Sequence, residues 1–230
     1  MSRRNDRKMP RDIGIGLFFG LLFLLTLLGQ AVAGHATYNN EQVSQGLQTL
    51  TFGQFLLSAS FTSDVMENWQ SEYLQFLLYV LATVWLVQRG SPESKDPGDA
   101  GRMSDEQQLV GPHAKRNSPA WAKASGLRLW VYSRSLSLVM GTIFVLSWLA
   151  QSITGRTTYN ATQLRSYEHP VSWVGYITAA DFWNRTLQNW QSEFLAVGSM
   201  AALSIYLRQR GSPESKPVGA PHAETGASTS

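Results

Sequence analysis

The chain has 230 residues and a formal net charge of +3, and only 15% of its residues are charged. It has no cysteine, which excludes disulfides, thiolate metal sites and a thiol nucleophile. Because its basic residues flank apolar segments, we expect a lipid bilayer and no nucleic acid as its partner. We also expect no metal and no cofactor, since no ligand spacing relates His35, His113, His169 and His222.

Four apolar segments follow one another along the chain, and each predicts a membrane-spanning helix. The first, residues 13–33, carries no charge and reaches the length of about 20 apolar residues that a bilayer core requires. A cleaved signal peptide is the alternative here, because basic residues precede this segment and Ala-Val-Ala ends it. Its length and a similar segment in mid-chain favour a retained helix. The other three segments are residues 69–87, 135–153 and 190–207.

An internal repeat relates the two halves of the chain. Residues 13–98 align with residues 134–219 without a gap, at an offset of 121. Residues 75–85 share no identity with their counterparts, so the apolar helix bodies have changed more than their ends. Two phrases are intact in both halves: NWQSE at 68–72 and 189–193, and QRGSPESK at 88–95 and 209–216.

The repeat predicts an all-α membrane protein with four transmembrane helices, built as two tandem helix–loop–helix copies. Two helices per copy give both copies the same orientation, so a pseudo-twofold axis along the membrane normal would relate them as a parallel repeat. Copy 1 is residues 13–89 with an outer loop at 34–68, and copy 2 is residues 134–210 with an outer loop at 154–189.

Basic residues also predict the orientation, since cytoplasmic segments are enriched in Lys and Arg. The outer loop of copy 1 has none of either, whereas the segments outside the copies have many. The N-terminus (1–12), the linker (90–133) and the tail (211–230) are therefore predicted to be cytoplasmic. The linker is rich in Pro, Gly, Ser and charge, which predicts that it is largely disordered.

Polar residues gather at the outer ends of the predicted helices, where NWQSE is predicted to begin the second helix of each copy. Asn68 can cap this helix in copy 1, or the helix begins earlier, near Ser63 or Asp64. Glu72 and Glu193 either reach the outer water, or face each other across the axis and share a proton. Gly34 and Gly155 are predicted to let the chain turn out of the first helix of each copy. The candidate cluster, functional or structural, is Gln30, Tyr38, Asn39, Asn68, Gln70, Glu72, Gln151, Tyr159, Asn160, Asn189, Gln191 and Glu193.

Two further features concern the loops and the helix ends. The aromatic-rich stretches 52–61 and 173–182 predict short helices in the outer loops. In QRGSPESK the helix is predicted to end at Gln88, with Gly90 in the left-handed conformation that suits a helix end. Glu93 and Lys95 are candidates for pairing with the other copy. The predicted interface anchors are Trp69, Trp190, Arg89 and Arg210.

With these motifs the chain resembles a family of uncharacterised bacterial integral membrane proteins, a domain of unknown function. The family pattern is GQ…G…YN, then NWQSEFLQ, then RQRGSxESK, and both copies carry it. Copy 1 departs from it at Tyr73 and Val87, and copy 2 departs at Ala196. The resemblance implies a multi-pass protein of the bacterial inner membrane with no established activity and no catalytic residues.

The sequence leaves three candidate functions. We expect a non-catalytic structural or interaction role in the cell envelope, with a second copy or another membrane protein as candidate partner. The alternative is a small transporter or proton-coupled carrier that uses Glu72 and Glu193. An enzyme acting through His35, Glu41 or His169 ranks last, because no catalytic motif supports it.

Overall fold

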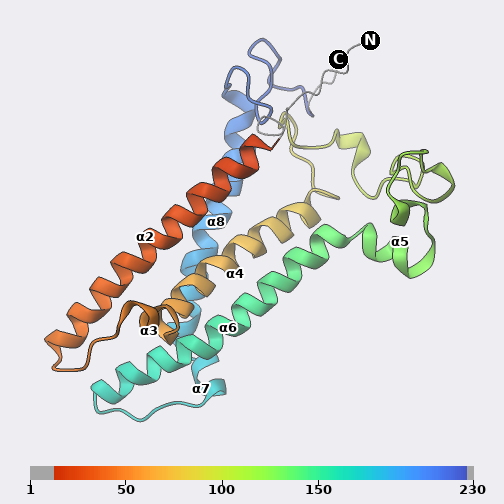
Figure 1. Cartoon of the computed structure of the whole chain (residues 1–230). Coiled ribbons are helices and arrows are strands. Elements are labelled where there is room, and N and C mark those ends of the chain that lie inside the picture. The colour runs from red at the N-terminus through yellow and green to blue at the C-terminus, as the bar shows by residue number, and fades with distance from the viewer. Residues whose placement is uncertain (1–12, 227–230) are drawn as a thin grey trace, which may run out of the picture. The chain divides into compact units, whose positions relative to one another are not determined.

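The computed structural model describes residues 13–226, which form α-helices, short 3-10 helices and loops without any β-strand (Figure 1). The prediction of an all-α protein is confirmed for this part of the chain. The chain divides into two compact units, Met1–Thr62 and Ser63–Ser230. The basic segment 1–12 and the end of the predicted tail lie outside the described residues.

The first unit contains α2 (Gly14–Ser44), α3 (Phe52–Leu56) and the start of α4 (Ala59–Ala82). Helix α2 continues well beyond the apolar run to Ser44, because contacts with the following loop and α3, such as Phe55 on Gly34 and Asn39 with Leu50, hold this polar part. The prediction that Gly34 lets the chain turn out of this helix is wrong, since Gly34 lies inside it.

Gly46, which lies 12 residues after Gly34, instead ends α2. Gly46 adopts φ 69°, and its N–H donates to the Val43 carbonyl (3.0 Å) while that of Leu47 donates to the Gln42 carbonyl (2.8 Å). These two bonds close a Schellman turn and satisfy carbonyls that the helix leaves free. The long helix of copy 2 ends in the same way, with Tyr167 at φ 60° in the position equivalent to Gly46.

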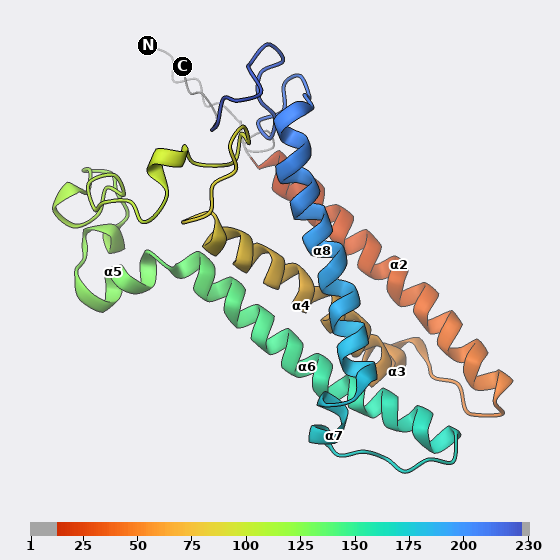
Figure 2. The same cartoon turned by 180° about the vertical axis from the view of Figure 1, so that it is seen from behind.

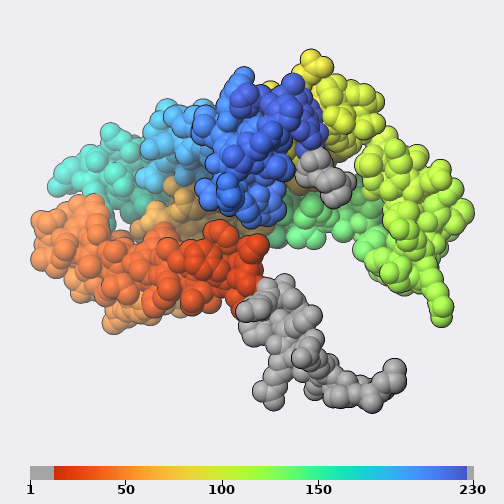
Figure 3. Space-filling model, turned by 90° about the horizontal axis from the view of Figure 1, so that it is seen from above, coloured from red at the N-terminus to blue at the C-terminus, as the bar shows by residue number. Residues whose placement is uncertain are grey.

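The second unit holds the rest of α4 and all later elements. Its long helices α4, α6 and α8 contact one another, with α4 and α6 side by side and α8 crossing them (Figures 1 and 2). The linker forms a lobe at one end of this unit (Figure 3), and its predicted disorder stays a prediction. The later elements are η1 (Pro97–Asp99), η2 (Gly111–His113), η3 (Ala120–Lys123), α5 (Gly126–Tyr132), α6 (Ser135–Arg165), α7 (Trp173–Ile177) and α8 (Ala180–Tyr206).

Two of the long helices, α2 and α6, are long and apolar enough to cross a membrane. Most of their large apolar side chains are exposed, as in Phe19 and Leu24 of α2 and Leu146 of α6. Exposed apolar surface on this scale marks a contact with lipid or with another protein. The structure therefore supports a membrane association.

The second long helix of each copy begins earlier than predicted. Helix α4 begins at Ala59 and α8 at Ala180, so NWQSE lies in their interior and the prediction that it starts them is wrong. Asn68 and Asn189 do not cap the helices. Each side-chain amide donates to the carbonyl four residues earlier, at 3.1 Å and 2.9 Å respectively.

The short helices predicted in 52–61 and 173–182 are present as α3 and α7, and each packs an aromatic ring against a glycine of the preceding long helix. The ring of Phe55 lies 3.1 Å from where a Cβ of Gly34 would stand. In copy 2 the Tyr176 ring lies equally close to Gly155, with its hydroxyl closer still. Both rings are almost fully buried, so these glycines serve a close approach and not a turn.

Helices α2 and α6 each have an asparagine that fixes the loop leading to the next short helix, α3 or α7. Asn39 donates to the Leu50 carbonyl and accepts from the Leu50 amide, both at 2.9 Å. Asn160 makes the same two bonds with Val171, at 3.0 Å and 2.9 Å. Each loop thus has its backbone satisfied by one side chain, which explains why the Tyr-Asn pair recurs.

We predict that Gly155→Ala destabilises the protein by about 1–3 kcal/mol, because the added methyl group would overpack the Tyr176 ring. Thermal unfolding in detergent micelles measures the effect. The matched control is Gly198→Ala in α8, where a Cβ would meet nothing within 4 Å. An unchanged unfolding temperature in Gly155→Ala would contradict this packing.

Candidate functional site

The two QRGSPESK motifs fold into the same hydrogen-bonded loop. The backbone N–H of Gln88 donates to Ser94 Oγ (2.8 Å), and that of Gln209 donates to Ser215 Oγ (2.9 Å). Gly90 has φ 87°, so the predicted left-handed glycine is confirmed. The predicted helix end at Gln88 is wrong, because α4 ends at Ala82 and the chain reaches the motif as turns and loop.

The motif lysines hold backbone carbonyls. Lys95 Nζ donates to the carbonyls of Gly101 (2.8 Å) and Val84 (3.4 Å). Lys216 is only 3% exposed, and its Nζ donates to the carbonyls of Pro221, His222 and Glu224 at 2.9–3.2 Å. The sequence hypothesis that Lys95 pairs with the other copy therefore fails for the lysine, which binds backbone near its own motif.

The motif glutamates do meet across the copies. The Tyr79 hydroxyl donates to Glu93 Oε2. A hydrogen bond with Glu93 raises the pKa of the Glu214 carboxyl, with smaller effects from burial and from the charge of Glu93. Two carboxyls in contact hold one proton between them more readily than two separate ones. Glu93 thus meets the equivalent glutamate of the other copy, and Lys216 instead binds backbone carbonyls.

The C-terminal segment joins this arrangement. The Gly90 N–H donates to Thr225 Oγ1 (2.9 Å), and the Gly226 N–H donates to the Ser91 carbonyl (3.0 Å). A Cβ on Gly90 would collide with the His222 carbonyl, so only glycine admits this approach. We call residues 88–95, 209–216 and 217–226 together the paired-motif end.

A second cluster lies inside the bundle of α4, α6 and α8. Gln70 is fully buried, and its Oε1 accepts a hydrogen bond from Trp190 Nε1 (2.7 Å). Gln151 and Thr186 are also fully buried, and their side-chain polar atoms have no partner among the described residues. Buried amide and hydroxyl groups of this kind are costly unless they are hydrogen-bonded. This polar interior lies beside stacked aromatic rings.

Aromatic side chains of α6 and α8 form that stack. The Trp148 ring lies 5.6 Å from the Phe144 ring, 5.9 Å from the Trp190 ring and 6.1 Å from the Phe182 ring, measured between centroids. Large rings contribute much of the buried apolar area of a small bundle. The stack therefore holds α6 against α8 and places Trp190 so that its indole can reach Gln70.

An ion pair links the N-terminal parts of α4 and α8. Arg185 Nη1 lies 3.4 Å from Glu67 Oε1, and Arg185 Nε lies 3.4 Å from Asp181 Oδ2. Glu67 is buried, so the Arg185 guanidinium is its charge partner inside the bundle. Sequence reasoning missed this pair. A signal was present, because the repeat aligns Asp64 with Arg185 and so exchanges the sign of the charge.

The predicted carboxylate pair lies one to two turns further along. Glu72 is exposed and Glu193 is half-buried. The charge of Glu72 acts on the Glu193 carboxyl, and Gln75 Nε2 donates to the Glu193 carbonyl (3.3 Å). The two acidic side chains are therefore neighbours, while one of them keeps its access to the surroundings.

The other predicted site residues differ in burial, in one case between the two copies. Gln70 is fully buried in the bundle, whereas its counterpart Gln191 is exposed. Both predicted anchor arginines are exposed, and both anchor tryptophans are half-buried. The half-buried remainder consists of Gln30, Tyr38 and Asn39 in the first unit and Tyr159, Asn160 and Asn189 in the second, while Asn68 is exposed.

We predict that Glu67→Gln lowers the free energy of unfolding by about 1 kcal/mol, because it removes the carboxylate that lies 3.4 Å from Arg185 Nη1. Denaturant titrations measure the effect. The exposed linker variant Glu106→Gln is the control. An equal free energy of unfolding in the two variants would refute a stabilising role of this pair.

We also predict that Lys216→Met loosens the paired-motif end. Three charge-assisted hydrogen bonds are lost, so amide hydrogen exchange in residues 217–226 should accelerate at least about tenfold. Exchange detected by mass spectrometry measures it. Lys115→Met, at an exposed linker position, is the control. Equal exchange in the two variants would show that Lys216 does not hold this segment.

Among the described residues, no group of three or more His, Cys, Asp or Glu side chains is placed to hold a metal ion. No curated protein and no solved structure matches the chain. A family model described as Domain of unknown function (DUF6766) matches residues 6–227. Since this match covers nearly the whole chain, the protein belongs to the DUF6766 family of unknown function.

Proposed function

We propose that this protein is a multi-pass protein of the bacterial inner membrane with a non-catalytic structural or interaction role. Four helices would span the bilayer as two helix–loop–helix copies related by a pseudo-twofold axis. Both termini and the linker would lie in the cytoplasm. A second copy of the chain or another membrane protein would be its partner.

The dimensions of α4 and α8 support four spans. They contain 24 and 27 residues, or about 36 and 40 Å at about 1.5 Å per residue, and a hydrocarbon core is about 30 Å thick. Apolar side chains in their C-terminal halves are exposed, such as Phe76 and Leu78 in α4 and Leu195 and Leu203 in α8. In a bilayer these side chains would face lipid.

The paired-motif end carries the proposal of a structural role. Its recurring serines and lysines bind backbone groups in or near this end, and its recurring glutamates bind each other. In the same way, Asn39 and Asn160 are engaged in holding their loops. The residues that recur in both copies are thus used to hold chain segments together, which is the chemistry of a scaffold.

The carrier remains the second candidate, and the proximity of Glu72 and Glu193 favours it. A proton carrier needs a carboxyl that changes protonation with access to one side at a time. Proton flux into liposomes containing the purified protein distinguishes the two functions. Flux that is lost in Glu72→Gln with Glu193→Gln would favour the carrier, and no flux in the unmodified protein favours the scaffold.

The absence of native cysteine makes the topology directly testable. We predict that Gln48→Cys reacts with a membrane-impermeant maleimide in intact cells and that Ser104→Cys reacts only after lysis. The reason is that α4 would return the chain to the cytoplasm between these two positions. If only α2 and α6 spanned the membrane, both positions would lie on the same side. Labelling of Ser104→Cys in intact cells would therefore refute the four-span arrangement.

A further inference from the structure

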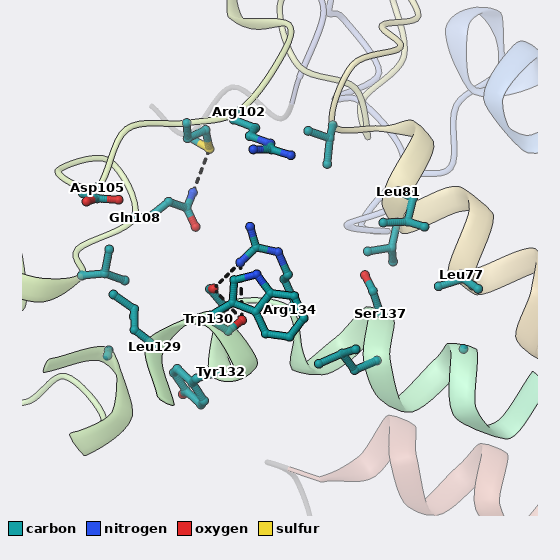
Figure 4. A pocket seen from close by; sticks show the side chains of 18 of the residues that line it. Leu77, Leu81, Arg102, Asp105, Gln108, Leu129, Trp130, Tyr132, Arg134 and Ser137 are labelled. Atoms are coloured by element: carbon teal, nitrogen blue, oxygen red, sulfur yellow. Dashed lines mark hydrogen bonds between the residues drawn. The ribbon is translucent and has the colours of Figure 1, made fainter. Parts of the chain in front are cut away.

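A large groove opens in the second unit between α4, the linker and the start of α6 (Figure 4). It has a volume of about 1540 Å³. Leu77 and Leu81 of α4 line one side, and Leu138, Gly141 and Val145 of α6 line the other. Residues of the linker and of α5 line the end of the groove near the start of α6, which we call its upper end. We call this feature the α4–α6 groove.

The floor of the groove is apolar and open. Leu81 is 40% exposed and Val145 is 57% exposed, so neither is covered by the chain itself. Gly141 provides space, since a Cβ there would already stand 3.6 Å from the Leu77 side chain. An apolar floor of this kind favours an apolar occupant.

The upper end of the groove is basic and aromatic. The Arg134 guanidinium lies 5.0 Å from the centre of the Trp130 ring, and that of Arg102 lies 5.9 Å from the Trp85 ring. Both arginines are exposed, and Figure 4 shows them at the same opening. One carboxylate, Asp105, also lines it, which leaves an excess of positive charge.

The distance between the basic end and the apolar floor matches one lipid leaflet. Arg134 and Val145 are 11 residues apart on or next to α6, which is about 16 Å at about 1.5 Å per residue. Half of a hydrocarbon core is about 15 Å. Arginine and tryptophan together at one end of such a surface are typical of the headgroup level of a membrane.

We propose that the α4–α6 groove binds one anionic phospholipid. Its phosphate lies between Arg102 and Arg134, where planar guanidinium groups suit a phosphate, and one acyl chain lies along the floor beside Gly141. The Lys95 amine is not required, because it is held by two backbone carbonyls. This inference rests on the proposed membrane location and adds a specific ligand class to it.

The test uses the purified full-length protein in detergent micelles and native mass spectrometry. Phosphatidylglycerol and phosphatidylcholine are titrated separately, and the fraction of lipid-bound protein is measured. We expect phosphatidylglycerol to bind more tightly, and Arg102→Gln with Arg134→Gln to weaken its binding at least about tenfold. Arg128→Gln is the matched control, because this exposed arginine of α5 does not line the groove.

A second variant tests the apolar part of the site. Gly141→Leu fills the floor and should weaken the binding of phosphatidylglycerol while leaving both arginines in place. The double arginine variant should fold, since within residues 13–226 the hydrogen bonds of the Arg134 side chain go to Trp130 and Ser133 of its own turn. Circular dichroism checks this.

Three outcomes would overturn the proposal: equal binding of the two lipids, an equal effect of Arg128→Gln, or displacement of phosphatidylglycerol by millimolar inorganic phosphate. The last would show a simple anion site that makes no use of the groove floor. The topology is measured independently by the cysteine labelling described above. Four spans without a preference for phosphatidylglycerol would therefore refute this inference alone, whereas outside labelling at position 104 would refute the membrane arrangement itself.

Discussion

Backbone groups that leave a helix must be hydrogen-bonded, and this chain meets that constraint with the same side chains in both copies. Asn39 and Asn160 satisfy an amide and a carbonyl of the loop that follows α2 and α6, respectively. Ser94 and Ser215 accept from an amide of the loop that follows α4 and α8, respectively. The recurring Asn and Ser residues therefore close the backbone at turns, whereas the recurring NWQSE lies inside α4 and α8.

The two copies share these turns but differ in the interior. Gln70 is buried and bonded to Trp190, whereas its counterpart Gln191 is exposed. At another equivalent pair of positions, copy 1 has Asp64 and copy 2 has Arg185, which pairs with Glu67. Equivalent positions thus carry unlike side chains at the contact between α4 and α8.

The fold class and the short helices α3 and α7 could be predicted from apolar and aromatic patterns. The helix ends could not, because hydropathy falls at residue 33 while contacts with the following loop keep the chain helical to Ser44. The role of Gly34 was mispredicted for a related reason. A glycine in sequence does not reveal whether it frees the backbone or makes room for a ring such as Phe55, which arrives from another element.

By itself the sequence determined the apolar segments and the phrases that occur twice, because these depend on local composition and on comparison along one chain. The tertiary structure alone decided that Lys216 holds three carbonyls, that Glu93 meets Glu214, and that Arg185 reaches Glu67. Each of these contacts depends on the packing of elements distant in sequence or on the path of an irregular loop. Neither hydropathy nor residue spacing contains that information, so the partners of these groups became known only once the helices and loops were placed in space.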